Sequence, residues 1–317
     1  MKNKEPLILA VVIFFSLVTY YLVEPFAHHV LHKKVVEVQS EGFAYNDLSA
    51  LTKTGDATRG EELVMNAGCA GCHSIDAAGM PAPMDPVMAA ASYGVNPPDL
   101  SNAGAIYDAK FLADLIKNPA HALKVEHKFD EAKGQMHPMV AFYGMGGDID
   151  QEVADMVAYM QSIAVKPEDV TPAMAFENAC GRCHAVGYEN WTQMGTKPSF
   201  KHKKDSLAFD IKLIEYQDSL KAYMGKLPPD LSMYIRSRGD DFLRKLVENP
   251  QNILAGTAMP RVGVTADAME KVLEHMKDAG DTKRAEREAI GKNVMIYIII
   301  FAVFAFLWKK QVWRDLK

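Results

Sequence analysis

Cysteine is scarce in this sequence, with four residues among 317. The four fall into two pairs, so none is left over for a structural disulfide. A basic excess is also missing: the formal net charge is −5, and no nucleic-acid partner is expected. The sequence shows no convincing strand pattern, which excludes a sheet-based fold and favours an all-α one. Paired carboxylates, a nucleophile triad and a phosphate-binding loop are not recognisable either, so we expect no catalytic site of its own.

Long apolar runs, in contrast, stand at both ends. Leu7 to Val23 and Val294 to Trp308 contain no charge. A membrane span needs about 20 apolar residues, and interfacial Tyr, Trp and Lys extend slightly shorter runs. Both runs are therefore predicted to be transmembrane helices. Basic residues flank them on the terminal sides and place both tails in the cytoplasm and the middle of the chain outside: Lys2, Lys4, Lys309, Lys310, Arg314 and Lys317.

The alternative for the first run is a cleaved signal peptide. The residues that follow it, Glu24-Pro25-Phe26-Ala27-His28, lack a small-x-small cleavage site. This favours an uncleaved anchor.

The middle of the chain contains an internal repeat. Pro97-Pro98-Asp99-Leu100-Ser101 recurs as Pro228-Pro229-Asp230-Leu231-Ser232, and the match continues without a gap as far as Leu123 and Leu254. Such a register predicts a tandem duplication. Each copy closes with an amphipathic helix, one over about Asp150 to Ile163 and one after the N-cap Thr265. The copies differ in length between these landmarks, and we expect the extra residues to be surface insertions.

Both cysteine pairs have the form Cys-x-x-Cys-His, with Cys69, Cys72 and His73 in one copy and Cys180, Cys183 and His184 in the other. This is the attachment motif of c-type haem, in which the thiols bind the haem vinyl groups and the histidine is the proximal iron ligand. A zinc site does not need a histidine after each second cysteine, and a thioredoxin-like pair belongs to an α/β pattern. The sequence therefore predicts two covalently bound haem c groups.

The sixth iron ligand should lie well downstream of each histidine. In the second copy Met259-Pro260 has the position at which c-type cytochromes usually place it. In the first copy Met139-Val140-Ala141-Phe142 is similar to the usual Met-Pro-x-Phe loop, so Met139 is predicted, with Met136 and Met145 in the same loop. Met80-Pro81 is too close to His73 to cross the haem. Histidine ligation remains the alternative and has three candidates: His121, His127 and His137.

These features predict an all-α protein with two tandem class I cytochrome c-like domains between transmembrane helices. The predicted organisation is an N-terminal anchor (1–27), a linker (28–55), domain 1 (56–165), domain 2 (166–280), and a charged linker with the C-terminal anchor (281–317).

The Pro-Pro-Asp-Leu-Ser block resembles cytochrome c1, the haem subunit of quinol–cytochrome c reductases (cytochrome bc1 complexes). In that family Pro-Pro-Asp-Leu-Ser-x-x-x-Arg-x-Arg packs beside the haem and an arginine contacts a propionate. The resemblance implies these roles for Pro98, Pro229, Arg236 and Arg238. The first copy has Ala105 and Tyr107 at the arginine positions, so the propionate role does not carry over to it. Two haem motifs and two anchors are similar to the diheme cytochrome c1 variant of some bacteria.

The resemblance implies a part in a respiratory chain, in the bacterial inner membrane with the haem domains on the periplasmic side. The protein would be an electron-transfer subunit that accepts electrons from a Rieske iron–sulfur protein beside cytochrome b. It would pass them to a soluble cytochrome c or an oxidase. One rival is a diheme subunit of a cbb3-type oxidase, which would not be expected to carry the C-terminal span or the cytochrome c1 block. Another is a diheme peroxidase, which needs one haem with an open sixth position.

Overall fold

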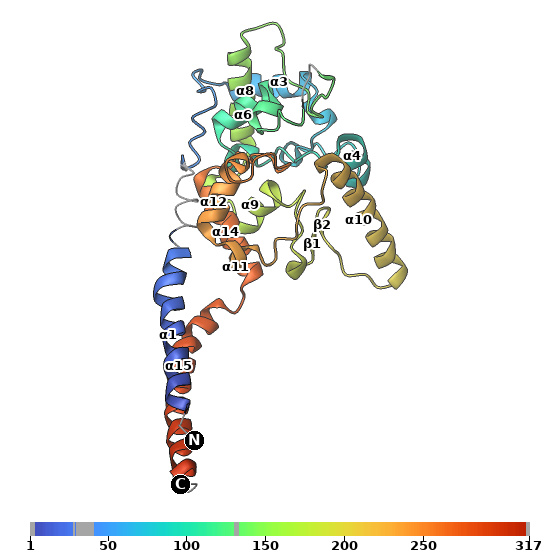
Figure 1. The fold of residues 1–317 in the computed structure, drawn as a ribbon. Coiled ribbons are helices and arrows are strands. Elements are labelled where there is room, and N and C mark those ends of the chain that lie inside the picture. The colour runs from blue at the N-terminus through green and yellow to red at the C-terminus, as the bar shows by residue number, and fades with distance from the viewer. Residues whose placement is uncertain (1–3, 28, 30–40, 130–132, 315–317) are drawn as a thin grey trace.

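Helices make up almost all of the regular structure in the computed structural model, which describes residues 4–27, 29, 41–129 and 133–314 (Figure 1). A helical body carries two long helices that leave it on one side. Within the described residues, the strands are limited to a two-residue hairpin, β1 (Trp191–Thr192) paired with β2 (Gly195–Thr196). The predicted all-α class is confirmed.

The first unit begins with α3 (Ala57–Asn66), whose N-cap Asp56 accepts hydrogen bonds from two backbone amides of the first turn. Its closing helix, α8 (Ile149–Ile163), packs directly on α3. Gly60 makes this approach possible, because a Cβ there would lie 2.0 Å from the Asp155 carbonyl oxygen. The elements between them are listed in chain order: η2 (Cys69–Gly71), η3 (Asp76–Ala78), α4 (Pro86–Tyr93), α5 (Ala103–Ile106), α6 (Ala109–Lys117) and α7 (Pro119–Ala122).

The second unit follows a short connection, η5 (Pro167–Asp169), and likewise begins with a helix before its Cys-x-x-Cys-His motif and ends with a closing helix. The side chains of Thr171 and Thr265 cap its first and last helices, as the sequence predicts. Those two helices pack together as α3 and α8 do. The elements are α9 (Pro172–Ala179), η6 (Gly187–Glu189), the β1–β2 hairpin, α10 (Lys203–Met224), α11 (Tyr234–Arg238), α12 (Asp240–Glu248), α13 (Pro250–Ile253) and α14 (Ala266–Gly280).

The insertion of the second unit is largely helical. The extra residues between His184 and the second Pro-Pro were expected to be a surface insertion, and 22 residues of this stretch form the helix α10. The C-terminal half of α10 packs on α4 of the first unit, where Tyr216 and Leu220 are completely buried against Ala90. The insertion is therefore part of the contact between the units, because its apolar side chains find a partner surface there.

The two units share one core. Buried side chains of α5, α6 and α8 belong to the same apolar cluster as those of α9, α12 and α14. The cluster also contains Phe43, Tyr45 and Leu48, which precede the first unit. The haem motifs are thus placed on a single packed body rather than on two bodies joined by a flexible linker.

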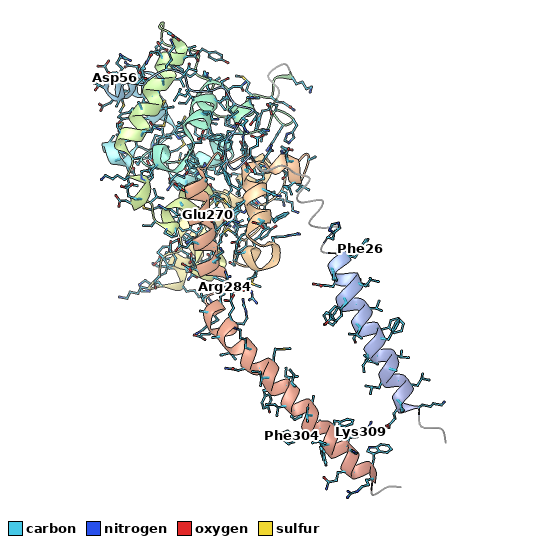
Figure 2. All side chains as sticks on the ribbon, turned by 90° about the vertical axis from the view of Figure 1, so that its left-hand side faces the viewer. Phe26, Asp56, Glu270, Arg284, Phe304 and Lys309 are labelled. Atoms are coloured by element: carbon cyan, nitrogen blue, oxygen red, sulfur yellow. The ribbon has the colours of Figure 1, made fainter. Side chains whose placement is uncertain are left out.

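The terminal helices could each span a membrane. One runs over Glu5–Ala27, including α1 (Glu5–Val18) and η1 (Thr19–Val23), and the other is α15 (Arg284–Arg314). The spanning windows of both are wholly unburied, and the two helices leave the body separately (Figure 2). Lys309 Nζ lies 3.0 Å from a Glu5 carboxylate oxygen near their far ends.

The predicted charged linker ahead of the last span is largely helical, because residues 284–293 belong to α15. Helix-forming Ala, Glu, Arg and Lys dominate that stretch and continue the span outward. Most of the predicted linker before residue 41, and the basic residues Lys2 and Lys317, lie outside the described residues.

Candidate haem sites

The imidazole of His73 is oriented by a backbone carbonyl. Its Nδ1 lies 2.8 Å from the Pro98 oxygen, which can only accept, so Nδ1 carries the proton and Nε2 is left with a free lone pair. Burial lowers the pKa of His73 and keeps the ring neutral at physiological pH. A neutral histidine with Nδ1–H bound to a carbonyl is the form that ligates iron through Nε2.

The second unit repeats this arrangement. His184 Nδ1 donates to the Pro229 carbonyl at 2.8 Å, and burial lowers the pKa of His184 as well. The Pro-Pro-Asp-Leu-Ser segment is held in the same way in both units, since Leu100 N donates to Ser74 O and Leu231 N to Ala185 O. The segment predicted to pack beside the haem therefore fixes the tautomer and the orientation of the proximal histidine.

No disulfide joins any of the four cysteines. Burial raises the pKa of Cys69 and raises that of Cys180 to about 12. Neither is a thiolate at neutral pH, which disfavours a redox pair or a reactive nucleophile. Within the described residues no cluster of histidine, cysteine or acidic side chains could hold a metal ion by itself. Two cysteines and an oriented histidine on one short turn fit haem c attachment in each unit.

The methionine candidates differ in exposure. Met139 and Met259 are half-buried, whereas Met136 and Met145 are 63% and 53% exposed. The Met139 loop is anchored by Phe142, whose backbone N–H donates to the Ile116 carbonyl. Burial of a thioether is what an iron ligand requires, so the structure favours the two predicted methionines, whose axial role stays a prediction.

The other candidates differ in their surroundings. Met80 is paired through its backbone with Ile75 in the turn after His73 and stays on that side. His121 is half-buried and lies 2.8 Å from Glu126, whereas His127 is exposed. His137 is half-buried and packs edge-on against the Phe129 ring, with centroids 4.8 Å apart.

Arg236 and Arg238 both lie on α11 and are exposed. The Arg238 guanidinium is 5.4 Å from the centroid of the Phe242 ring. Their predicted contact with a haem propionate stays a prediction.

Sequence reasoning missed the contact between the two haem motifs. Arg182, which stands between Cys180 and Cys183, donates through Nη1 to the Asn96 carbonyl at 3.1 Å. Tyr216 of α10 joins the same group, because its hydroxyl donates to Arg182 O at 2.9 Å and accepts from Asn96 N at 3.2 Å. Asn96 is two residues from Pro98, which orients His73. The second haem motif is therefore hydrogen-bonded to the segment that orients His73, the predicted proximal histidine of the first motif.

Further contacts place the attachment turns of both motifs at this junction. Cys183 packs in a small cluster with residues of α4 and α10, and the Cys72 sulfur is 3.6 Å from the hydroxyl of Tyr93, the last residue of α4. Tyr107 of the first unit donates to the carbonyl of Asn178, just before the second motif. Arg182 Nε is buried without a hydrogen-bond partner among the described residues, which fits a missing acceptor beside the haem sites. The motif spacing alone gives no sign of this junction.

Comparison with known proteins supports the haem assignment for the first unit. No curated protein matches the chain significantly. Similarity to a solved structure, a chain described as "Hyperthermophilic respiratory Complex III", amounts to 22% identity and a TM-score of 0.35 over 46% of this chain and 75% of that one. The family model of cytochrome c matches residues 57–164. Residues 57–164 thus match a cytochrome c domain, which implies covalently bound haem c in the first unit.

Proposed function

We propose that this protein is a dihaem electron-transfer subunit of a membrane-bound quinol–cytochrome c reductase. It accepts electrons from a Rieske iron–sulfur protein and delivers them to a soluble cytochrome c or an oxidase. The observation that carries the proposal is the repeated site, in which the carbonyls of Pro98 and Pro229 each hold the Nδ1–H of the histidine in a Cys-x-x-Cys-His turn. The cytochrome c1-like block thus serves both motifs.

Haem c supplies one-electron redox chemistry when it is bound. The chain supplies four thiols for attachment, two neutral imidazoles oriented by carbonyls, and two half-buried methionines. Its part in the reaction is that of an electron-transfer subunit without catalytic groups of its own, and quinol is oxidised on other subunits. The terminal helices anchor it in the inner membrane of a bacterium with the haem units on the periplasmic side.

The junction around Arg182 connects the two sites within the chain. Hydrogen bonds of Arg182 and Tyr216 join the second attachment motif to Asn96, two residues before the Pro98 that orients His73. The proposal is therefore a relay through both sites rather than two independent carriers.

We expect the Soret circular dichroism of the protein to be bisignate, because two like chromophores held close in a fixed orientation couple their transition dipoles. Arg182→Gln, which removes the charge and the donor to Asn96, should reduce its amplitude. Arg244→Gln, which breaks a surface ion pair with Glu270 away from the junction, is the matched control and should leave the signal unchanged. A simple single-signed band in the unaltered protein would show that the haems are not coupled.

Isolation in mild detergent tests the proposed partners. We expect the chain to co-purify with b-type haem and a [2Fe–2S] centre, and to be reduced by quinol only when both are present and in an antimycin- or stigmatellin-sensitive way. A copper-containing oxidase core without a Rieske signal would instead assign it to a cbb3-type oxidase. Peroxide turnover with one high-spin haem would assign it to the diheme peroxidases.

A further inference from the structure

Arg261 stands two residues after Met259 and is 1% exposed. It is the largest of the fully buried side chains in the described residues. Burial of a guanidinium is unfavourable unless an opposite charge and hydrogen-bond acceptors compensate it. This buried arginine beside a predicted iron ligand therefore requires both among the groups that bind it.

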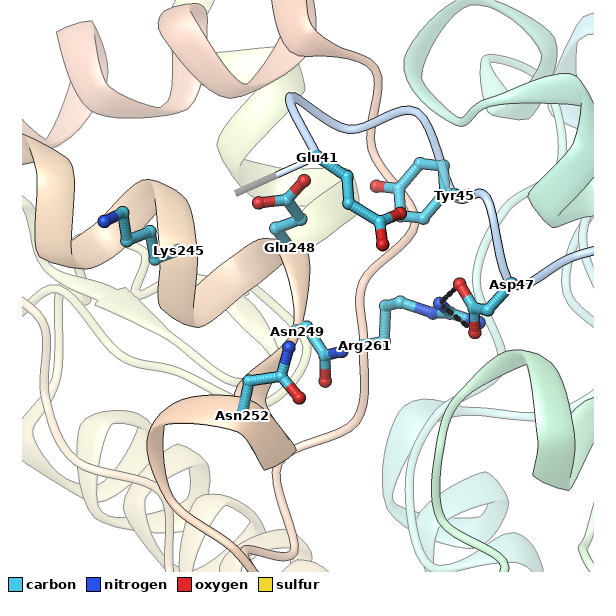
Figure 3. A pocket seen from close by; sticks show the side chains of 8 residues that line it. All are labelled: Glu41, Tyr45, Asp47, Lys245, Glu248, Asn249, Asn252 and Arg261. Atoms are coloured by element: carbon cyan, nitrogen blue, oxygen red, sulfur yellow. Dashed lines mark hydrogen bonds and ion pairs between the residues drawn. The ribbon is translucent and has the colours of Figure 1, made fainter. Parts of the chain in front are cut away.

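The partners of Arg261 come from outside its own unit. Its backbone N–H donates to Leu123 O at 2.9 Å, and its Nε donates to Ala122 O at 2.8 Å, at the end of α7 in the first unit. Nη1 donates to both carboxylate oxygens of Asp47, at 2.8 and 2.9 Å (Figure 3). Residue 261 is thereby held from two directions by segments far away in the sequence.

Asp47 belongs to a segment that we call the strap, residues 41–48, which connects the N-terminal anchor side of the chain to the first unit. The strap is fixed to the second unit as well, because the Tyr45 hydroxyl donates to Val264 O at 2.6 Å and Phe43 N donates to Glu248 at 2.8 Å. Tyr45 is 2% exposed and has a positive φ of 47°, a conformation that costs energy for a non-glycine residue. Packing and hydrogen bonds hold the strap in place against that cost.

The strap and α12 leave only a small cavity beside Arg261. Its volume is about 30 Å³, and polar side chains of both elements line it (Figure 3). This is enough for about one water molecule and too little for a ligand. Nη2 of Arg261 is buried without a hydrogen-bond partner among the described residues.

The part of the loop that follows Met259 depends on the contacts of Arg261 with the first unit, whereas the part before it does not. Ahead of Met259 the loop is held locally, since Gln251 bonds Thr257 O and Gly256 N, and Thr257 Oγ1 accepts from Met259 N. Behind Met259 the backbone hydrogen bonds go to the first unit: Arg261 N to Leu123 O, and Thr265 N to Ile106 O.

We propose that Arg261 is a positioning residue for the sixth iron ligand of the second haem, and that the first unit and the strap complete that site. The inference rests on the proposed function, in that Met259 ligates iron. A thioether is a weak neutral ligand, and its bond to iron depends on a loop that holds the sulfur at the right distance. The first unit has Ala141 at the matching place, two residues after Met139, so no arginine side chain can support the Met139 loop from that position.

The test uses the full haem-loaded chain and the far-red charge-transfer band of methionine-ligated ferric haem c. In Arg261→Gln we expect about half of this band to be lost, because one site of two is affected. Binding of carbon monoxide to that ferrous haem should tighten by about 10- to 100-fold, the range seen when supporting partners of metal ligands are removed. Arg261→Lys keeps the charge but loses the Nε donor to Ala122 O, so both readouts should lie between those of the unaltered protein and Arg261→Gln.

Two further variants keep the inference open to refutation if Arg261→Gln does not fold. Asp47→Asn leaves the contacts of Arg261 with Ala122 and Leu123 in place and should weaken the band in the same sense by a smaller amount. Arg244→Gln is the matched control, because it breaks a bidentate pair with Glu270 on the surface of the same unit and should change nothing. An intact band and unchanged carbon monoxide binding in Asp47→Asn and in any folded Arg261 variant would overturn the positioning role.

Met259→Ala separates this inference from the proposed ligand. If Met259→Ala abolishes half of the band and Arg261→Gln does not, Met259 is a ligand and only the role of Arg261 is wrong. If Met259→Ala leaves the band intact, the ligand assignment fails and the inference fails with it.

Discussion

Replacement of both Cys180 and Cys183 by alanine is expected to halve the covalently bound haem, from two groups per chain to one. The two thiols of a motif are the covalent attachment points of one haem, and no other cysteine is available to replace them. The first pair, Cys69 and Cys72, is untouched and should retain its haem. A pyridine haemochrome assay on denatured protein, combined with haem staining after electrophoresis, measures the ratio.

The reciprocal variant, in which Cys69 and Cys72 are replaced, is the control and should also retain one haem. Unaltered protein with a single haem, or haem that extracts into acidic acetone, would contradict the two-site assignment. Loss of all haem from either variant would show that neither unit matures without the other, since the two units share one core.

Replacement of Met259 by histidine is expected to keep the second haem low-spin and to lower its reduction potential markedly. A thioether stabilises ferrous iron relative to ferric iron, and an imidazole does so less, so methionine–histidine ligation has the higher potential. Optical titration of the haem α-band against potential should show one of two steps moving down and the other unchanged.

Met139→His is expected to shift the other step in the same direction. Met136→His is the matched control in the same loop, since Met136 is 63% exposed and should leave both steps in place. A shift with Met136→His and none with Met139→His would reverse the ligand assignment in the first unit.

The haem-binding chemistry could be predicted from the sequence because it depends on residues close together in the chain. Cys69, Cys72 and His73 lie on one turn, and their spacing indicates haem c attachment without any tertiary information. The helix starts at Thr171 and Thr265 were also predictable, since an N-cap acts on amides two or three residues away. The apolar ends predicted two helices long enough to span a membrane for a similar reason, because the length of an apolar run is a local property.

The insertion of the second unit shows where this kind of reasoning stops. Its length relative to the first copy suggested a surface insertion, but Tyr216 and Leu220 of α10 are buried against Ala90 of α4 in the other unit. The apolar periodicity of a sequence predicts a helix but does not identify the surface against which that helix will pack. The same holds for Arg182, which reads as an exposed spacer inside a motif until the two units are in contact.

The sequence by itself determined what this protein binds and how it is built: two haem motifs, a duplicated helical unit and an apolar helix at each end. Only the tertiary structure decided how the sites are completed. The carbonyls that orient His73 and His184 lie 25 and 45 residues away along the chain, and the carboxylate that binds Arg261 lies 214 residues away. Hydrogen bonds and burial over such separations depend on how the whole chain packs, and no local pattern of residues encodes them.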